Sequence, residues 1–260
     1  MSKERKFAIE MAKKAGKIIQ RDFKIGMKSW YKKDKTVVTK ADIQISQMVT
    51  RSVRKAFPEH CVLSDDENEA PKKSKVWVCD PIDGTLMFIH GVPTCTFSLA
   101  LVEDGKPTVG VIYDPFTNRM FHAEKGKGAF LNGKRIYVST KSDIKYSLMG
   151  LTCWYERGSF TDINEAYRKL IHESVNLLDI GSITYMGSLV AAGQFEATVH
   201  PSTSAKDSAA LKIIVEEAGG KVTDLFGDEQ RYDQKIKGCI ISNGLVHPEM
   251  VKIVRACVYS

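Results

Sequence analysis

The sequence has few cysteines and no closely spaced pair of them. A zinc site or a disulfide framework normally needs such pairs, so neither is expected here. Reduced thiols are typical of a cytoplasmic protein. The six cysteines are Cys61, Cys79, Cys95, Cys153, Cys239 and Cys257.

Long apolar runs are also missing. No stretch approaches the roughly 18 apolar residues that a membrane span requires. The first residues, Met1–Lys6, are mostly charged and lead into an amphipathic stretch, so they do not resemble the apolar part of a signal peptide. We therefore expect a cytoplasmic protein that does not contact a membrane.

Acidic residues are scarce only near the N-terminus. The net charge is +7, but residues 1–40 hold 13 Lys/Arg against 4 Asp/Glu, and the remaining residues are nearly balanced. A solvated helix face accounts for such a local excess, and attraction of an anionic substrate is the alternative. No recognition motif accompanies the charge, so nucleic-acid binding is not expected.

The composition, with 43% hydrophobic and 27% charged residues, is that of an ordinary globular protein of 260 residues. The periodicity predicts a mixed α+β protein, rich in antiparallel strands over 1–140 and alternating over 141–260, without a flexible linker. Helices are predicted over 3–23, 42–57, 162–174, 183–192 and 208–218, and from 248 onward. Strands are predicted over 61–63, 76–79, 95–103, 108–113, 119–123, 147–151, 195–199, 221–224 and 238–242, with a loop over 24–39.

The most informative segment is Asp80-Pro-Ile-Asp-Gly-Thr85. A buried strand delivers two carboxylates to its C-terminal end, Gly84 permits tight backbone geometry, and a short helix opens at Thr85. Carboxylates beside the free N–H groups of a helix repel an anion unless cations lie between them. The segment therefore predicts hard divalent cations, held by oxygen ligands, that bridge the protein to a phosphate.

Two other acidic features lie at the ends of predicted elements, and the aspartates also have simpler interpretations than metal binding. Asp65-Asp66-Glu67 follows the strand over 61–63, and Asp207 begins a strongly apolar helix that Gly219-Gly220 closes. Asp and Gly are ordinary turn residues, so the pair in Asp80–Thr85 is also compatible with a capped turn, and Asp207 with a helix N-cap.

The segment Asp80–Thr85 resembles the signature of the inositol monophosphatase family, the magnesium-dependent, lithium-sensitive phosphatases. Further segments resemble family motifs and keep the family order, so the resemblance covers nearly the whole chain. They are 35–42, 126–133, 216–222 and 240–243. The resemblance implies a layered αβαβα sandwich, usually a homodimer, with two or three Mg²⁺ ions that Mn²⁺ can replace.

The resemblance also implies roles for individual residues. Asp80 bridges two metals, Asp83 and Asp207 bind the more buried one, and the Ile82 carbonyl is a further ligand. Asp65 supplies the first-metal carboxylate, with Asp66 and Glu67 as alternatives. Gly84 and Thr85 bind phosphate through backbone N–H groups, and the Thr85 hydroxyl orients the attacking water. Asp42 is a candidate for a weaker metal held through water.

Several positions depart from the family pattern. Lys206 stands where the family has Trp, Met87 where it has Asn, and Leu178 where it has Arg. Leu178 lies three residues before Gly181. The resemblance places Gly181 and Ser182 at the substrate pocket. His200 replaces an acidic residue that binds sugar hydroxyls, so it is either a specificity residue or an exposed loop histidine. Trp30 and Tyr31 are either base-stacking residues or loop anchors.

The resemblance thus predicts a phosphomonoesterase that hydrolyses a small phosphorylated polyol with metal-activated water, by default inositol 1-phosphate. Within the family, 3′(2′),5′-bisphosphate nucleotidase, fructose-1,6-bisphosphatase and histidinol-phosphate phosphatase are the alternatives. The departures leave one alternative of another class, a catalytically weak binding or regulatory protein on the same fold.

Overall fold

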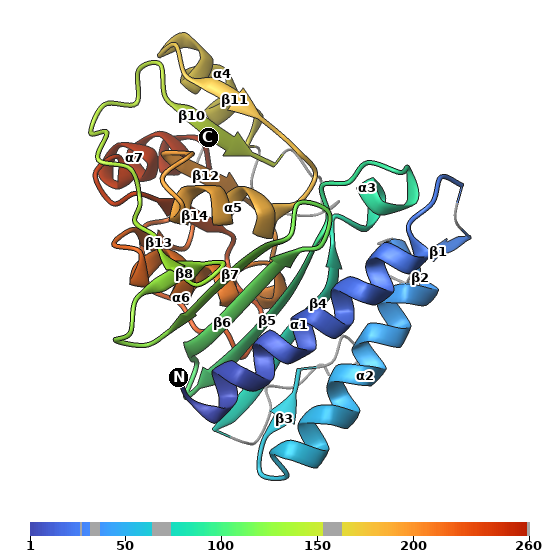
Figure 1. Ribbon diagram of the computed structural model, residues 1–260. Coiled ribbons are helices and arrows are strands. Elements are labelled where there is room, and N and C mark those ends of the chain that lie inside the picture. Colours follow the sequence, from blue (N-terminus) through green and yellow to red (C-terminus); the bar gives the residue numbers. More distant parts are fainter. Residues whose placement is uncertain (27, 32–36, 64–73, 153–162, 259–260) are drawn as a thin grey trace.

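The computed structural model describes residues 1–26, 28–31, 37–63, 74–152 and 163–258. Two large sheets organise the chain, and helices lie on both faces of each (Figure 1). A small two-stranded sheet, β1 (Ser29–Tyr31) and β2 (Val37–Thr39), lies apart from them. None of the helices within the described ranges is long and apolar enough to cross a membrane.

The first large sheet has seven strands in the order in which the chain makes them. Only its first pair, β3–β4, is parallel. The strands alternate between two cores, as a sheet buried on both faces requires, so Val76 and Val78 face one core and Trp77 and Cys79 the other. Its strands are β3 (Cys61–Val62), β4 (Lys75–Asp83), β5 (Thr96–Glu103), β6 (Lys106–Asp114), β7 (Arg119–Glu124), β8 (Ala129–Leu131) and β9 (Lys134–Arg135).

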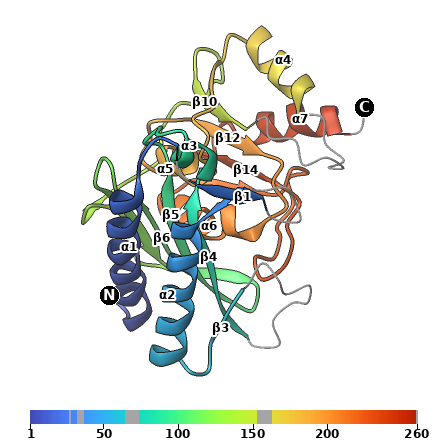
Figure 2. The ribbon, with the colours of Figure 1, turned by 90° about the vertical axis from the view of Figure 1, so that its right-hand side faces the viewer.

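Two long helices cover the outer face of this sheet and run side by side, as Figures 1 and 2 show. They are α1 (Lys3–Asp22) and α2 (Lys40–Ala56). Helix α2 begins with a capping box, in which Thr39 and Asp42 satisfy each other's backbone N–H groups. The apolar faces of both helices pack on Trp77, Phe97 and Leu99.

The second large sheet has five strands in the order β11-β10-β12-β14-β13. Helices α5 (Ile183–Ala191) and α6 (Ala209–Glu217) share one core with both large sheets, and α4 (Asn164–His172) and α7 (His247–Val258) cover the far face. The layers are therefore αβαβα, as predicted. The five strands are β10 (Leu148–Leu151), β11 (Asn176–Leu178), β12 (Ala197–His200), β13 (Lys221–Thr223) and β14 (Cys239–Ser242).

Three local expectations were wrong. The segment 24–39 contains the β1–β2 hairpin, whose strands are too short for their alternation to be visible. The strand expected over 76–79 continues to Asp83, because Asp80 and Asp83 still pair with β5 across an irregularity where Pro81 lacks an N–H group. Strand β11 was not predicted. The sheets change between residues 135 and 148, and the division at 140 stays a prediction.

Candidate metal centre

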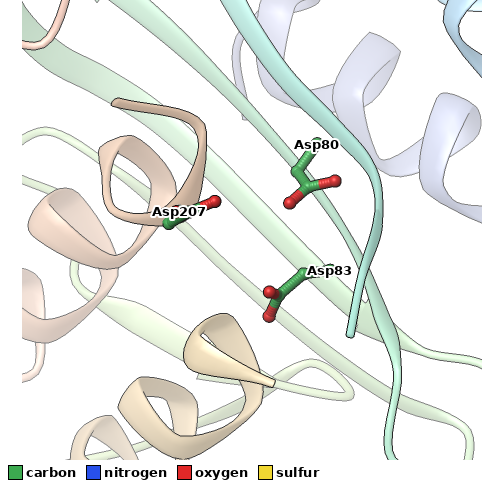
Figure 3. Close-up of side chains that lie close together, drawn as sticks. All are labelled: Asp80, Asp83 and Asp207. Carbon is green, nitrogen blue, oxygen red and sulfur yellow. The ribbon is translucent and has the colours of Figure 1, made fainter. Parts of the chain in front are cut away.

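Three aspartates from distant parts of the chain meet in one place. Asp80 and Asp83 lie at the end of β4, and Asp207 lies in the short 3₁₀ turn η1 (Ala205–Asp207) before α6. Each contributes a carboxylate oxygen to a group in which all such oxygens lie within 4.8 Å of one another. Figure 3 shows the three side chains pointing toward one another. The structure thus brings together the acidic residues of the two separate motifs.

The backbone after Asp83 turns sharply to make this approach possible. Gly84 has φ of +83°, and a Cβ atom there would lie 2.9 Å from the carbonyl oxygen of Gly181. A side chain at residue 84 would therefore push the two loops apart. The short helix α3 (Thr85–Ile89) starts directly after this glycine and exposes its first N–H groups next to the carboxylates.

Neutral donors hold all three carboxylates. The Ile82 N–H donates to Asp80 Oδ1 at 3.2 Å. The hydroxyls of Ser182 and Thr184 and the Thr184 N–H all donate to Asp83 Oδ2, at 2.6, 2.7 and 2.7 Å. The Ser202 hydroxyl donates to Asp207 Oδ2. These bonds fix the orientation of the carboxylates without neutralising them.

Burial dominates the electrostatics of the cluster, and neighbouring like charges add to it at Asp80. Burial raises the pKa of Asp80 well above its usual range, and the charges of Asp83, Asp207 and Asp42 raise it further. Burial also raises the pKa of Asp83, against the opposing effect of its hydrogen bonds. No cation pairs with Asp80 or Asp83 in the described part of the chain.

Thr85 links this cluster to Asp42. Its hydroxyl donates to the Ile82 carbonyl at 2.8 Å and lies 3.5 Å from Asp42 Oδ1. Asp42 Oδ2 in turn accepts from the Thr39 N–H and hydroxyl. Asp42 therefore lies at the border of the cluster, held by the cap of α2.

These residues fit a hard divalent cation. Two oxygens on opposite sides of one Mg²⁺ ion are about 4 Å apart, since each bond is about 2.1 Å long, and the cluster needs little contraction to reach that spacing. The donor set is oxygen only, which Mg²⁺ and Mn²⁺ prefer. A cation also removes the repulsion that raises the pKa of Asp80.

The remaining predicted residues fall into three groups. Asp65, Asp66 and Glu67 lie outside the described residues. Gly181 and Ser182 lie directly against Gly84 and Asp83, and their assignment to the substrate pocket stays a prediction. Trp30 is 45% exposed on β1, which is compatible both with base stacking and with a partly buried anchor, so both interpretations stay predictions.

The position of His200 in the structure contradicts both interpretations given above for this residue. It is fully buried in β12, so it is neither an exposed loop residue nor a side chain on an open pocket wall. Its Nε2 lies 3.2 Å from the Ser208 hydroxyl, and burial lowers its pKa to about 3. The reason is that the strand predicted to end at residue 199 continues through His200. This residue therefore pairs with Cys239 of β14 within the sheet.

Sequence reasoning missed Thr184 and Ser202, the hydroxyl donors to the carboxylates. Ser202 belongs to the run Ser202-Thr203-Ser204 just upstream of Asp207, and Thr184 follows the helix cap Ser182. Short runs of hydroxyl residues near a candidate ligand were therefore the available signal.

Comparisons with known proteins agree with this geometry. A family model described as the inositol monophosphatase family matches residues 1–259. A protein of Thermotoga maritima named fructose-1,6-bisphosphatase/inositol-1-monophosphatase is 34% identical over 97% of this chain and 96% of its own. Nus factor SuhB of Escherichia coli K12 is 30% identical over 96% of this chain and 93% of its own. The solved structure of an IMPase from Thermotoga maritima superposes with a TM-score of 0.88 at 32% identity and covers 99% of both chains.

Proposed function

The chain belongs to the inositol monophosphatase family of metal-dependent phosphatases, and from this premise we propose that it is a magnesium-dependent phosphomonoesterase for a small phosphorylated polyol. Inositol 1-phosphate is the default substrate. The observation that carries the proposal is the convergence of Asp207 on Asp80 and Asp83, because a structural cap or turn would not gather three carboxylates without a cation.

The proposed ligands follow from the cluster. Asp80, Asp83 and Asp207 hold the metal, and the Ile82 carbonyl, which already accepts from Thr85, contributes a further oxygen. Asp65 completes the set, with Asp66 and Glu67 as alternatives. Two or three Mg²⁺ ions, or Mn²⁺ in their place, would lower the pKa of a bound water and neutralise charge on the phosphate.

The protein's own groups position the reactants. The Thr85 proton points at the Ile82 carbonyl, so the hydroxyl oxygen accepts a hydrogen bond from the attacking water and orients it. Backbone N–H groups at Gly84 and Thr85 bind the phosphate oxygens where α3 begins. Ser182 and Thr184 keep Asp83 in one orientation, which preserves the geometry of the site between turnovers.

The decisive experiment measures phosphate release with Mg²⁺, and with Mg²⁺ plus Li⁺, from four substrates in parallel. They are inositol 1-phosphate, fructose 1,6-bisphosphate, histidinol phosphate and a 3′,5′-bisphosphate nucleotide. We expect metal-dependent turnover that Li⁺ inhibits, and the largest kcat/KM for inositol 1-phosphate. If the protein releases phosphate from none of the four substrates, the proposal is overturned.

A second candidate is a catalytically weak binding protein on this fold. It is favoured by the departures at Met87, Leu178 and Lys206 and by relatives named Nus factor SuhB. Asp80→Asn separates the two candidates, because it removes metal binding and turnover but leaves the outer surface intact. Partner binding that survives this change, in a chain that never shows turnover, would establish the second candidate.

We also propose that the protein is a cytoplasmic homodimer and that it binds no nucleic acid. Residues 1–140 and 141–260 would be two parts of the chain joined without a flexible linker. The five described cysteines are free thiols, which supports a reducing compartment. Sedimentation at several protein concentrations tests the dimer.

A further inference from the structure

Three buried polar atoms on two neighbouring strands have no hydrogen-bond partner. They are the hydroxyl oxygens of Thr152 and Thr198 and Nδ1 of His200, and among the described residues these are the only buried side-chain atoms in this state. Each of the three residues is at most 2% exposed. Buried polar groups are nearly always paired, so an unpaired group requires a physical explanation.

The strand register places the three side chains on one face of the five-stranded sheet. Strands β10 and β12 are parallel, Gly150 pairs with Thr198, and the Thr152 N–H donates to the Val199 carbonyl at 3.1 Å. Thr152 follows Gly150 by two residues, and His200 follows Thr198 by two, so all of them share the same face. A Cβ atom at Gly150 would lie 2.7 Å from the Thr198 hydroxyl, so the glycine leaves space beside that hydroxyl.

A second buried histidine, His247, shows the hydrogen bonds that such a ring requires. Its Nε2 lies 3.0 Å from the Thr223 hydroxyl, and its Nδ1 lies 2.8 Å from the Ser242 hydroxyl. His200 has only one contact of this kind, in which Nε2 lies 3.2 Å from the Ser208 hydroxyl. Whichever nitrogen carries the proton, Nδ1 of His200 needs one more partner, and a buried water can both donate and accept.

The contact of His200 with Ser208 closes the loop that carries Asp207. This contact spans eight residues and encloses the bond from the Ser202 hydroxyl to Asp207, which spans five. Ser208 directly follows Asp207 in the chain, so the position of one depends on that of the other. The His200 ring therefore fixes the end of β12 relative to the residue next to this carboxylate.

We propose that Thr152, Thr198 and His200 bind a buried water, and that the His200 ring held in this way is a positioning residue for Asp207. The contacts run from the water to Nδ1, and from Nε2 through Ser208 to the carboxylate segment. The positioning role rests on the proposed metal centre, whereas the water site does not. Groups that orient a metal ligand in this manner raise its affinity for the metal by about tenfold or more.

Thermal unfolding of the metal-free chain tests the water site. Valine has the shape of threonine without the hydroxyl, so Thr152→Val with Thr198→Val removes two partners of the water, and Tm should fall. If the hydroxyls have no partner, the same change removes two unpaired polar groups, and Tm should rise. The control Thr223→Val removes a hydroxyl that is paired with His247, and its Tm should fall. An unchanged or raised Tm in the double variant overturns the water site.

Calorimetry with Mg²⁺ tests the positioning role. We expect His200→Leu to lower the affinity for Mg²⁺ by about tenfold, and His200→Gln, whose amide reaches the position of Nε2, to recover most of the loss. The control His247→Leu removes an equally buried histidine away from the aspartates, and it should change the affinity less than twofold. Ser208→Ala breaks the same contact from its other side. Parent-like affinity in both His200→Leu and Ser208→Ala overturns the positioning role.

Hydrogen exchange of the metal-free protein gives a measurement that uses neither metal nor turnover. We expect His200→Leu and Ser208→Ala to speed exchange over 202–208, and His247→Leu to leave this segment unchanged. Equal exchange over 202–208 in all variants and the parent would show that the contact does not hold the loop. A parent chain that binds no Mg²⁺ would refute the metal centre but not the unfolding or exchange results, so the two failures are distinguishable.

Discussion

The two ends of helix α6 carry two groups of acidic residues that differ in how their charge is balanced. At the N-terminal end, Asp207 joins Asp80 and Asp83, and only hydroxyl and N–H groups contact Asp83. Toward the other end, Glu216 and Glu229 share the ammonium group of Lys212. Burial raises the pKa of Glu216 as well, but Lys212 opposes the shift. The first group needs a cation from solution, whereas the second contains its own.

This contrast is the reason why we assign the carboxylate cluster at one end of α6 to metal binding and the cluster at the other end to the framework. Neutral donors orient a carboxylate and leave its charge available to a metal. A lysine orients it and cancels the charge. The nature of the donors, more than the number of acids, therefore separates the two uses, and the contrast can be broken at either end.

The largest expected effect comes from Asp80→Asn. Without this carboxylate the cluster no longer binds Mg²⁺ strongly, and turnover should fall by about a thousandfold or more. The metal-free variant should be more stable than the parent, because a repelling charge is gone. Calorimetry with Mg²⁺, phosphate release and thermal unfolding measure the three effects, with the exposed Glu249→Gln as the control. A variant that binds Mg²⁺ like the parent would contradict the assignment.

Lys212→Met breaks the other end of the contrast. The change removes the hydrogen bond from Nζ to the Val222 carbonyl and leaves Glu216 and Glu229 facing each other. We expect the free energy of unfolding to fall by about 2 kcal/mol, a typical cost for losing charged hydrogen bonds at a buried group. Urea denaturation measures it, and Lys252→Met on the exposed face of α7 should have little effect. Metal binding should persist, and its loss would show that the two ends are not independent.

Thr184→Val sharpens the contrast, since it removes a neutral donor and keeps the shape of the side chain. Asp83 loses one hydrogen bond that lowers its pKa, so protons compete better with the metal. Loss of such a supporting bond costs about tenfold in metal affinity. Thr184→Ser keeps the hydroxyl, so its metal affinity should equal that of the parent. Equal affinities in the parent and in Thr184→Val would show that the hydroxyl has only a structural role.

The sequence predicted the carboxylates better than their surroundings, for a physical reason. Asp80, Asp83 and Gly84 lie within one short motif, and Asp207 lies at the start of a strongly apolar helix. These local patterns also fit a capped turn and a helix N-cap, so the resemblance to the family was needed to select the residues as ligands. The layered fold followed from the resemblance and is confirmed. The donors Thr184 and Ser202 reach the aspartates only through tertiary packing, and the burial of His200 depends on one further residue of strand β12. Sequence periodicity does not resolve a strand end to one residue.

The smallest expected effect is a dependence of stability on pH that changes sign with metal. A carboxyl whose pKa is raised in the folded state binds protons more readily when folded, as Asp80 and Asp83 do. Its contribution to stability is therefore greatest below its unfolded pKa of about 3.9 and is lost as the pH rises through the folded value. The metal-free protein should gain stability from these groups as the pH falls from about 7.5 to about 5.5.

Metal reverses this dependence, because Mg²⁺ binds the deprotonated carboxylates and competes with protons. The increase in Tm that Mg²⁺ produces should thus be larger at about pH 7.5 than at about pH 5.5, and thermal unfolding with and without Mg²⁺ at both values measures it. Lys212→Met should keep this difference and Asp80→Asn should lose it, since the carboxylates at which protons compete with the metal are those at the aspartate end of α6. A difference that disappears in Lys212→Met instead would place the responsible protons at the wrong end of the helix.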